Sequence, residues 1–223
     1  MLSDPQIERY SRQIILPQVG GKGQQRLLHA NVLVHGDGPW QPEALLYLTA
    51  AGVGHIGIHG NGCRPLWAAL APESPDSAII ALQRLNPDCT ITVHNPQLFQ
   101  ADEEAAQLVQ HYDVVLAEPH PQMHAACYAM QRPFVCGQVR AATAWFAVYR
   151  GYEEQRPCFS CEPWPVSDPS LSYEAEELTG PFVGTVLATE AVKLILGLHP
   201  SAPTTLGNGT VAALSVLKDE AQE

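Results

Sequence analysis

The stretch NVLVHGDGPWQPEALLYLTAAGVGHIGIH, residues 31–59, contains the pattern that decides the fold. It begins with a short apolar run, Asn31–His35, which ends at Gly36 and predicts a buried strand. Apolar residues then recur at helical spacing over Trp40–Ala51, and a second apolar run, His55–His59, predicts another strand. Short apolar strands on either side of a helix are typical of a parallel βαβ unit.

The same alternation continues toward the C-terminus. Further strands are expected at Thr90–His94, Asp113–Leu116 and Phe134–Val139, and helices at 74–85, 102–110 and 122–131. We expect Trp145–Tyr149 to add an edge strand, Pro181–Leu196 to form a helix that Gly197 closes, and Val211–Leu217 to form a last strand. The sequence therefore predicts an α/β fold: a doubly wound, mostly parallel Rossmann-like sheet with helices on both faces and a C-terminal crossover extension.

Three parts of the chain differ in character. Residues 1–30 read as a helical segment, with a helix over Gln6–Leu16, a break at Gly20-Gly21 and one or two helical turns over Gln24–His29. Residues 31–150 hold the Rossmann-like core. Residues 151–223 hold the crossover, in which Gly151–Thr179 is rich in Pro, Glu and Ser and predicts a long excursion rather than a packed element.

Composition excludes several classes of function. The chain has 223 residues, 46% of them hydrophobic, and its net charge is −11. Such a surplus of negative charge argues against binding to nucleic acid or to anionic membrane surfaces, because both need basic side chains. We see no apolar run of the roughly 18–20 residues that span a bilayer and no apolar signal-peptide core at the start. We therefore expect a soluble, cytoplasmic protein.

The turn after the first strand is the first candidate site. Gly36 and Gly38 stand between a strand and a helix, where glycines let backbone N–H groups approach a phosphate. Pro39 lacks a donor, Asp37 adds repulsion, and Trp40 stands where a small residue would admit a nucleotide. The alternative is a tight strand-to-helix turn without a ligand.

Other polar residues follow the second and fourth strands. His59 stands where nucleotide folds place a carboxylate for the ribose. Glu118 follows the fourth strand and could hold a metal, or simply be solvated. His120 and His124 are spaced i, i+4 and could share a helix face, but no third ligand accompanies them.

The six cysteines do not indicate a disulfide scaffold in a chain of this size. Cys158 and Cys161 form a C-x2-C pair, which has the spacing of half a tetrahedral zinc site. A closed site needs two more ligands, which His199 or a partner subunit could help to supply. The alternative is a pair of thiols without metal, since two thiolates alone rarely hold zinc.

Three stretches together resemble the ubiquitin-activating-like family that includes the bacterial ThiF, MoeB and HesA proteins. The similarity lies in RYSRQIILP with GQQRL near the N-terminus, in LYLTAAGVGHIGI, and in GPFVG leading into ATEAVK, residues 9–17, 23–27, 46–58, 180–184 and 188–193. With the Cys158–Cys161 pair between them, these motifs cover nearly the whole chain in family order.

The resemblance implies a homodimer that uses ATP and magnesium to adenylate the C-terminal glycine of a ubiquitin-like or sulfur-carrier protein. Arg12 matches the family's N-terminal arginine, which reaches the phosphates in the neighbouring subunit's site, and Gly36 and Gly38 remain from its glycine-rich turn. The other positions depart from the family pattern. Ser74 occupies the position of the family's phosphate-binding lysine, and His120 that of its magnesium-holding aspartate. Tyr173 occupies the position of the cysteine that in many members forms a thioester.

These departures favour a degenerate member that keeps the fold and the dimer surface without adenylating. Losing one contact that stabilises developing charge commonly costs about 2.7–4 kcal/mol of transition-state stabilisation. The main hypothesis is a scaffold or binding protein, homodimeric or paired with an active relative, that engages a carrier protein or a peptide. The alternatives are an active adenylyltransferase with a rebuilt site and a small-molecule binder lined by Trp40, His59 and His120.

The excursion is the predicted recognition surface. Its carboxylates outnumber its basic residues, which favours a partner with a basic patch. Trp164 and Tyr173 need shelter or a partner, and we predict that they contact the partner. The alternative is a loop that only caps the sheet.

Overall fold

The computed structural model describes residues 1–60, 75–94, 102–140, 143–153, 159, 174–199, 204–207 and 210–213. In these residues an eight-stranded sheet has the order β3-β2-β1-β4-β5-β6-β7-β8. The strands are β1 (Asn31–His35), β2 (His55–His59), β3 (Thr90–His94), β4 (Val114–Ala117), β5 (Phe134–Arg140), β6 (Thr143–Tyr149), β7 (Thr204–Gly207) and β8 (Thr210–Ala213). The first five pair in parallel and the last three antiparallel, which confirms the predicted fold class.

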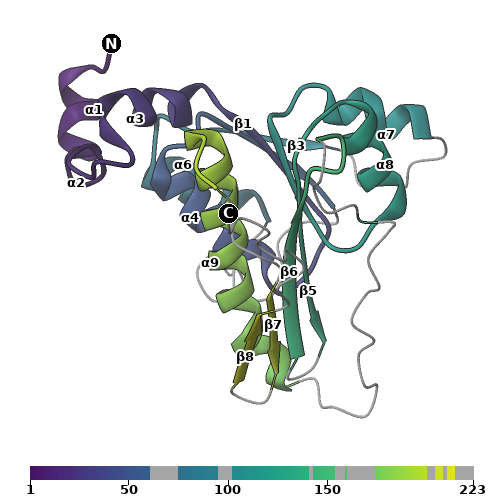
Figure 1. The fold of residues 1–223 in the computed structure, drawn as a ribbon. Coiled ribbons are helices and arrows are strands. Elements are labelled where there is room, and N and C mark those ends of the chain that lie inside the picture. Colours follow the sequence, from purple (N-terminus) through teal and green to yellow (C-terminus); the bar gives the residue numbers. More distant parts are fainter. Residues whose placement is uncertain are drawn as a thin grey trace, which may run out of the picture.

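Helices cover both faces of this sheet (Figure 1). They are α1 (Asp4–Arg9), α2 (Ser11–Ile14), α3 (Gly20–His29), α4 (Gln41–Ala51), α6 (Pro75–Leu85), α7 (Asp102–Val109), α8 (Pro121–Ala129) and α9 (Glu174–Leu196). One apolar core joins α4, α6 and α9 to one face, and a second joins α7 and α8 to the other. Alternate residues of β1 enter different cores: Val32 and Val34 enter the first and Leu33 the second.

The β1-α4-β2 unit forms where its sequence predicts it. The three central residues of β1 are buried, and its register with β2 pairs Asn31 with His55 and His35 with His59. Helix α4 ends at Ala51 and is capped by Gly52, which adopts the left-handed conformation with φ +86°. Glycine is favoured there because a Cβ strains this conformation.

Several local expectations are wrong. The predicted helix over Gln6–Leu16 is two helices, because Tyr10 leaves the helical conformation as its ring enters the interior. Helix α3 begins at Gly20 rather than breaking at Gly20-Gly21. Strand β6 is not an edge, since β7 and β8 extend the sheet beyond it. Val211–Ala213 of the predicted last strand lie in β8, which pairs with the unpredicted β7, and the rest of that prediction lies outside the described residues.

Helix α9 begins at Glu174, inside the segment that we expected to lack packed elements, and it contains Pro181. A proline in a helix interior costs about 3 kcal/mol, so other contacts must offset it. Gly180 and Gly184 let α9 approach α4 closely. A Cβ at Gly184 would lie 3.0 Å from both the Ala44 nitrogen and the Glu43 Cβ.

The range Thr179–Leu196 within α9 is also long and apolar enough to span a membrane, with a mean hydropathy of 1.3. This range contradicts the expectation that no apolar run is long enough to span a bilayer. Its residues Val183, Leu187 and Ala191 are fully buried in the core that α9 shares with α4 and the sheet. The same composition is therefore explained by a core helix.

A buried side chain, that of Tyr10, helps to fasten the N-terminal segment to the rest of the chain. The Tyr10 hydroxyl donates to Asp88 Oδ2 at 3.0 Å and accepts from Asn86 Nδ2 at 2.9 Å. Asn86 Nδ2 also lies 2.7 Å from the Thr49 carbonyl oxygen, so this group joins the N-terminal segment to α4 and to the end of α6. Burial of Tyr10 raises the pKa of its hydroxyl to about 12.

Candidate functional site

Three neighbouring strands end in histidine at the carboxyl edge of the sheet. The register pairs His35 of β1 with His59 of β2, and His59 with His94 of β3. Register partners in parallel strands point to the same face, and here that face is the one covered by α7 and α8. Ligands of open α/β sheets bind beyond this edge, so these side chains form a candidate site.

His35 and His59 form a direct imidazole pair. Their Nδ1 atoms lie 2.8 Å apart, and their rings are stacked with centroids 4.9 Å apart. At this distance one Nδ1 carries a proton and donates it to the other, so the two rings adopt different tautomers. His120 approaches the pair with its ring at 86° to that of His35, at a centroid distance of 4.8 Å.

His120 is fixed by its place in the chain. It is the N-cap of α8, and its Nδ1 accepts a hydrogen bond from the Met123 backbone nitrogen at 3.2 Å. An Nδ1 that accepts leaves the proton of a neutral ring on Nε2. Pro121 follows directly, and the fixed φ of proline suits the first position of a helix.

Burial keeps these imidazoles neutral. It lowers the pKa of His35 to about 3, with His120 and His59 as further causes. Burial also lowers the pKa of His59, helped by His94 and His120, and that of His120. Desolvation disfavours the charged form of a base, so the cluster presents nitrogen lone pairs and N–H groups rather than positive charge.

The β1–α4 turn lies beside this cluster and is closed by its own side chains. Gly36 has φ +108°, and its carbonyl accepts from Gln41 Nε2 at 2.6 Å. Trp40 is fully buried, in the core that α4 and α9 share. A Cβ added at Gly38 would touch both the Trp40 indole nitrogen and the Glu118 carboxylate.

The first turn of α4 offers few free donors. The Gln41 backbone N–H donates to the Gly38 carbonyl at 3.0 Å, and Pro42 has no N–H. Glu43 places a buried carboxyl in the same turn, and burial raises its pKa. The features that make a helix N-terminus attract anions, free N–H groups and a positive end, are weakened here.

The structure separates several residues that the sequence brings together. Trp40 lies on the opposite face of the sheet from His59 and His120, so the three do not line one pocket. His124 does not join His120 in a site, because its ring is buried and stacks on Phe159 at a centroid distance of 4.7 Å. This interaction also places Phe159 of the crossover segment in the core under α7 and α8.

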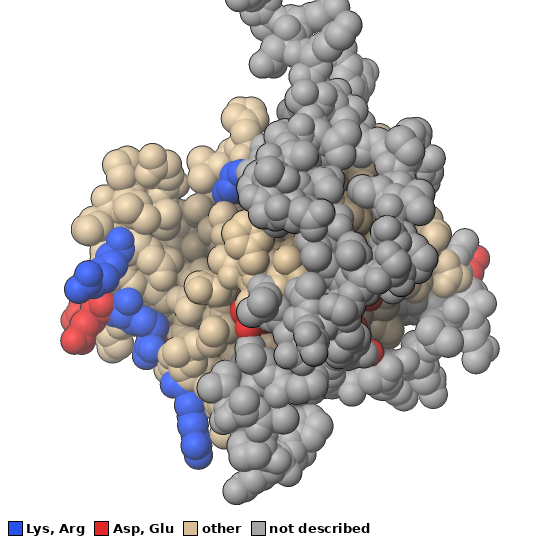
Figure 2. Space-filling model, turned by 90° about the horizontal axis from the view of Figure 1, so that it is seen from below, with Lys and Arg blue, Asp and Glu red and all other residues tan. Residues whose placement is uncertain are grey.

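Arg12 lies far from this edge within its own chain. It is exposed on α2, beside α3, which leads into the opposite end of β1 (Figure 1). Figure 2 shows basic side chains gathered over the N-terminal helices. Residues 1–30 carry four Lys or Arg and two Asp or Glu in an otherwise acidic chain. The predicted sites at Cys158, Cys161, Trp164 and Tyr173 lie outside the described residues.

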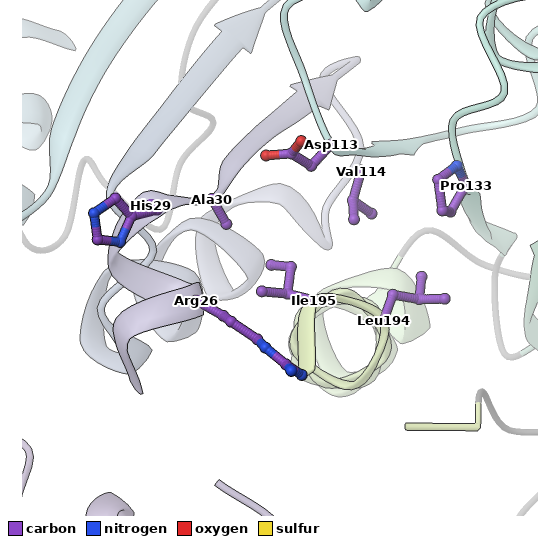
Figure 3. A pocket seen from close by; sticks show the side chains of 8 residues that line it. All are labelled: Arg26, His29, Ala30, Asp113, Val114, Pro133, Leu194 and Ile195. Atoms are coloured by element: carbon purple, nitrogen blue, oxygen red, sulfur yellow. The ribbon is translucent and has the colours of Figure 1, made fainter. Parts of the chain in front are cut away.

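A hollow of about 380 Å³ lies at the amino edge of the sheet, opposite the histidines (Figure 3). Its lining includes Arg26 of α3, Asp113 before β4 and Ile195 of α9. The Arg26 guanidinium donates to the Leu196 carbonyl at 3.0 Å. Asp113 accepts from the Asn31 backbone nitrogen at 2.8 Å. These polar groups bind other parts of the same chain. The carboxyl edge of the sheet is therefore the better candidate for a ligand site.

Sequence reasoning missed His35 as a site residue. The signal was available, because the predicted strands NVLVH, HIGIH and TITVH each end in histidine. Their common ending is informative only once the three strands are known to be neighbours in register.

Comparisons with known proteins agree with the fold and the motif order. The family model described as the ThiF family matches residues 76–219. The adenylyltransferase and sulfurtransferase MOCS3 of Drosophila willistoni is 33% identical over 218 residues, covering 88% of this chain and 47% of the relative. Its counterpart from Drosophila grimshawi is 34% identical over 219 residues, with 88% and 48% covered. The chain thus spans about half the length of these curated relatives.

Solved structures show the same fold at low identity. The crystal structure of selenomethionine PaaA superposes with a TM-score of 0.74 and 16% identity, covering 95% of this chain and 73% of that one. The crystal structure of E. coli MccB with ATP superposes with a TM-score of 0.70 and 14% identity, covering 92% of this chain and 69% of that one. Because the family model spans more than half of the chain and the predicted motifs fall in family order, this protein belongs to the ThiF family.

Proposed function

We propose that this protein binds the C-terminal tail of a ubiquitin-like or sulfur-carrier protein, or a peptide, and does not adenylate it. Family membership supports the partner class, since relatives include enzymes named adenylyltransferase and sulfurtransferase, and a structural neighbour was solved as MccB with N-formylated MccA. The observation that supports the absence of adenylation is the closed β1–α4 turn.

ATP and magnesium are the groups that this family implies, and the described residues do not fit them. A phosphate cradle needs glycine-lined backbone with free N–H groups. Here the Trp40 indole and the Glu118 carboxylate cover Gly38, and Gln41 uses its backbone N–H within the turn. Asp37 and Glu118 place carboxylates beside the turn, where they would repel a triphosphate.

The position expected for a magnesium ligand is held by a neutral imidazole. Magnesium prefers oxygen ligands in octahedral geometry, whereas His120 presents nitrogen and uses Nδ1 to cap α8. The described residues therefore do not support phosphoryl or adenylyl transfer. Binding of a partner's tail requires none of these groups.

We propose that the protein is a homodimer, or a heterodimer with an active relative. The N-terminal segment carries exposed apolar side chains, with Ile15 77% and Leu16 49% accessible, next to Arg9 and Arg12. A surface that combines apolar and basic groups suits the acidic remainder of a second copy. Arg12 would then act in the partner rather than in its own chain.

The second candidate is an active adenylyltransferase with a rebuilt site. The names of the curated relatives favour it over a non-adenylating protein, and Gly36 and Gly38 keep the family's glycine positions. Under this candidate the Trp40 and Glu118 side chains must move away from Gly38 when nucleotide binds. Nucleotide binding therefore distinguishes the two candidates.

The recognition surface is proposed at Trp164 and Tyr173, and a half zinc site at Cys158 and Cys161. The test uses the full chain and a purified carrier protein that ends in Gly-Gly, chosen from the gene's neighbourhood. We expect calorimetry to show binding without ATP, and the double variant Trp164→Ala/Tyr173→Ala to lose it while keeping its melting temperature. Phe182→Ala, which alters an exposed aromatic residue on α9, is the matched control. Undiminished binding by the double variant would refute this surface.

A further inference from the structure

The sheet ends at β3, and the outer side of this strand has no partner strand in the described part of the chain. Its inner side pairs in parallel with β2 along its whole length. The Thr90 backbone N–H donates to the Gly54 carbonyl at 2.9 Å, so this N–H faces β2. Backbone N–H and C=O groups point to alternate sides along a strand. Those of Ile91 and Val93 therefore point outward.

Strand β3 lacks the features that usually protect an edge strand. Charged side chains, prolines and bulges normally blunt such edges, because unpaired backbone groups attract other strands. The five residues of β3, TITVH, include no lysine, arginine, carboxylate, proline or glycine. Threonine, isoleucine and valine also have high β-propensity. The outer side of β3 is therefore a template on which another strand can pair.

The two faces of β3 determine which strand fits. Ile91 packs against the core that α6 shares, and Val93 lies on the same face with 50% of its surface exposed. On the other face, Thr92 Oγ1 lies 2.9 Å from His55 Nε2. The His55 ring in turn stacks on Tyr112 at a centroid distance of 5.6 Å. These contacts hold the edge in place, and β3 presents aliphatic and hydroxyl groups to an added strand.

We propose that the outer edge of β3 binds an extended, uncharged segment of a partner protein by strand addition, with aliphatic and small polar residues alternating in that segment. Main-chain hydrogen bonds to Ile91 and Val93 hold the segment, and an aliphatic side chain beside Val93 covers its exposed surface. A charged residue in the segment would lose water without meeting an opposite charge on β3. This surface goes beyond the tail recognition proposed above, and its test involves no carrier protein.

Hydrogen exchange of the full chain, followed by NMR, shows whether the edge is free. The backbone N–H groups of Ile91 and Val93 should exchange at least tenfold faster than those of Thr90 and Thr92, which face β2. Equal protection of the four groups would mean that another part of the chain, or a second copy, already covers this edge. That result would overturn the proposal.

The binding test uses a fluorescein-labelled synthetic peptide of alternating valine and threonine, with a lysine beyond each end for solubility. We expect anisotropy to show a dissociation constant of about 100 μM or tighter, and exchange at Ile91 and Val93 to slow in the complex. The same peptide with N-methylated backbone nitrogens cannot donate to the edge and should bind at least tenfold more weakly. No binding at about 1 mM peptide, or equal binding of both peptides, would overturn the proposal.

A substitution at Val93 identifies the edge as the binding site. Val93→Pro removes an outward N–H and leaves the pairing with β2 intact, because an edge strand tolerates proline where its nitrogen faces solvent. It should weaken peptide binding at least tenfold, whereas the matched control Val93→Thr keeps the N–H and should bind as the wild-type chain does.

The melting temperature identifies a Val93→Pro chain that does not fold. Val93→Lys, which adds a charge at the same exposed position, then decides in its place and should also weaken binding at least tenfold. Unchanged binding by the folded variant would overturn the proposal. Light scattering that shows a larger species lost in Val93→Lys would overturn it in favour of a second copy at this edge.

Discussion

Lowering the pH should destabilise the fold through His35. Its pKa is lowered to about 3 by burial and by its histidine neighbours, against an ordinary value of 6.5. Between these two values the unfolded chain binds a proton at this residue and the folded chain does not. Stability from the neutral ring is therefore complete above about pH 6.5 and falls as the pH drops toward 3.

The size of the effect follows from the same two values. The ordinary pKa of histidine is 6.5, so pH 5 lies about 1.5 pH units below it. At 1.36 kcal/mol per unit, protonation of this residue in the unfolded chain favours unfolding by about 2 kcal/mol. At pH 7 the loss of stability through this residue is close to zero. The fold should thus lose about 2 kcal/mol through this residue alone between pH 7 and pH 5.

The assay is urea unfolding of the wild-type chain and His35→Gln at both pH values, with a chelator present to exclude bound metal. Glutamine does not titrate, so its own cost in stability is the same at both pH values and cancels. His59 and His120 titrate in both proteins. We expect the wild-type chain to lose about 2 kcal/mol more than the variant. Losses that agree within about 0.5 kcal/mol, the usual error of such differences, would refute the buried, neutral imidazole.

Three further substitutions test the N-terminal segment and its anchorage. Tyr10→Phe should lower the free energy of unfolding by about 1–3 kcal/mol, because one buried N–H of the Asn86 amide loses its acceptor; an unchanged urea midpoint would contradict the network. Gly52→Ala should cost about 2 kcal/mol or more, since φ is +86° and the new Cβ would lie 2.6 Å from the Tyr10 ring; a fully stable variant would argue against this turn. Ile15→Glu should yield a monomer by light scattering, whereas Ile80→Glu, at an exposed position of α6, should not; a wild-type chain that is already monomeric would contradict the dimer.

The parallel core could be predicted because its signals are local. The strands Asn31–His35, His55–His59 and Thr90–His94 have the bounds that their apolar runs indicate. The C-terminal part could not, because its helix is stabilised by distant contacts. Pro181 reads as a helix start, yet α9 continues through it since Gly180 and Gly184 let it pack on α4.

The site was only partly predictable for a similar reason. The sequence marked Gly36 and Gly38 as retained family positions and His59 and His120 as altered ones, but the spatial relations of these residues depend on strand order. Nothing local indicates that His35 faces His59, because 24 residues separate them along the chain. The burial of Trp40 on the other face likewise depends on the packing of α9 against α4.

The most direct test of the account is ATP binding by the purified full chain, with magnesium and with and without the Gly-Gly carrier. Calorimetry should detect no ATP binding, and radiolabelled pyrophosphate should not exchange into ATP in the presence of the carrier, because Trp40 and Glu118 cover Gly38. A dissociation constant near 10 μM, about 7 kcal/mol of binding, together with carrier-dependent exchange, would contradict the central claim and establish the adenylyltransferase instead.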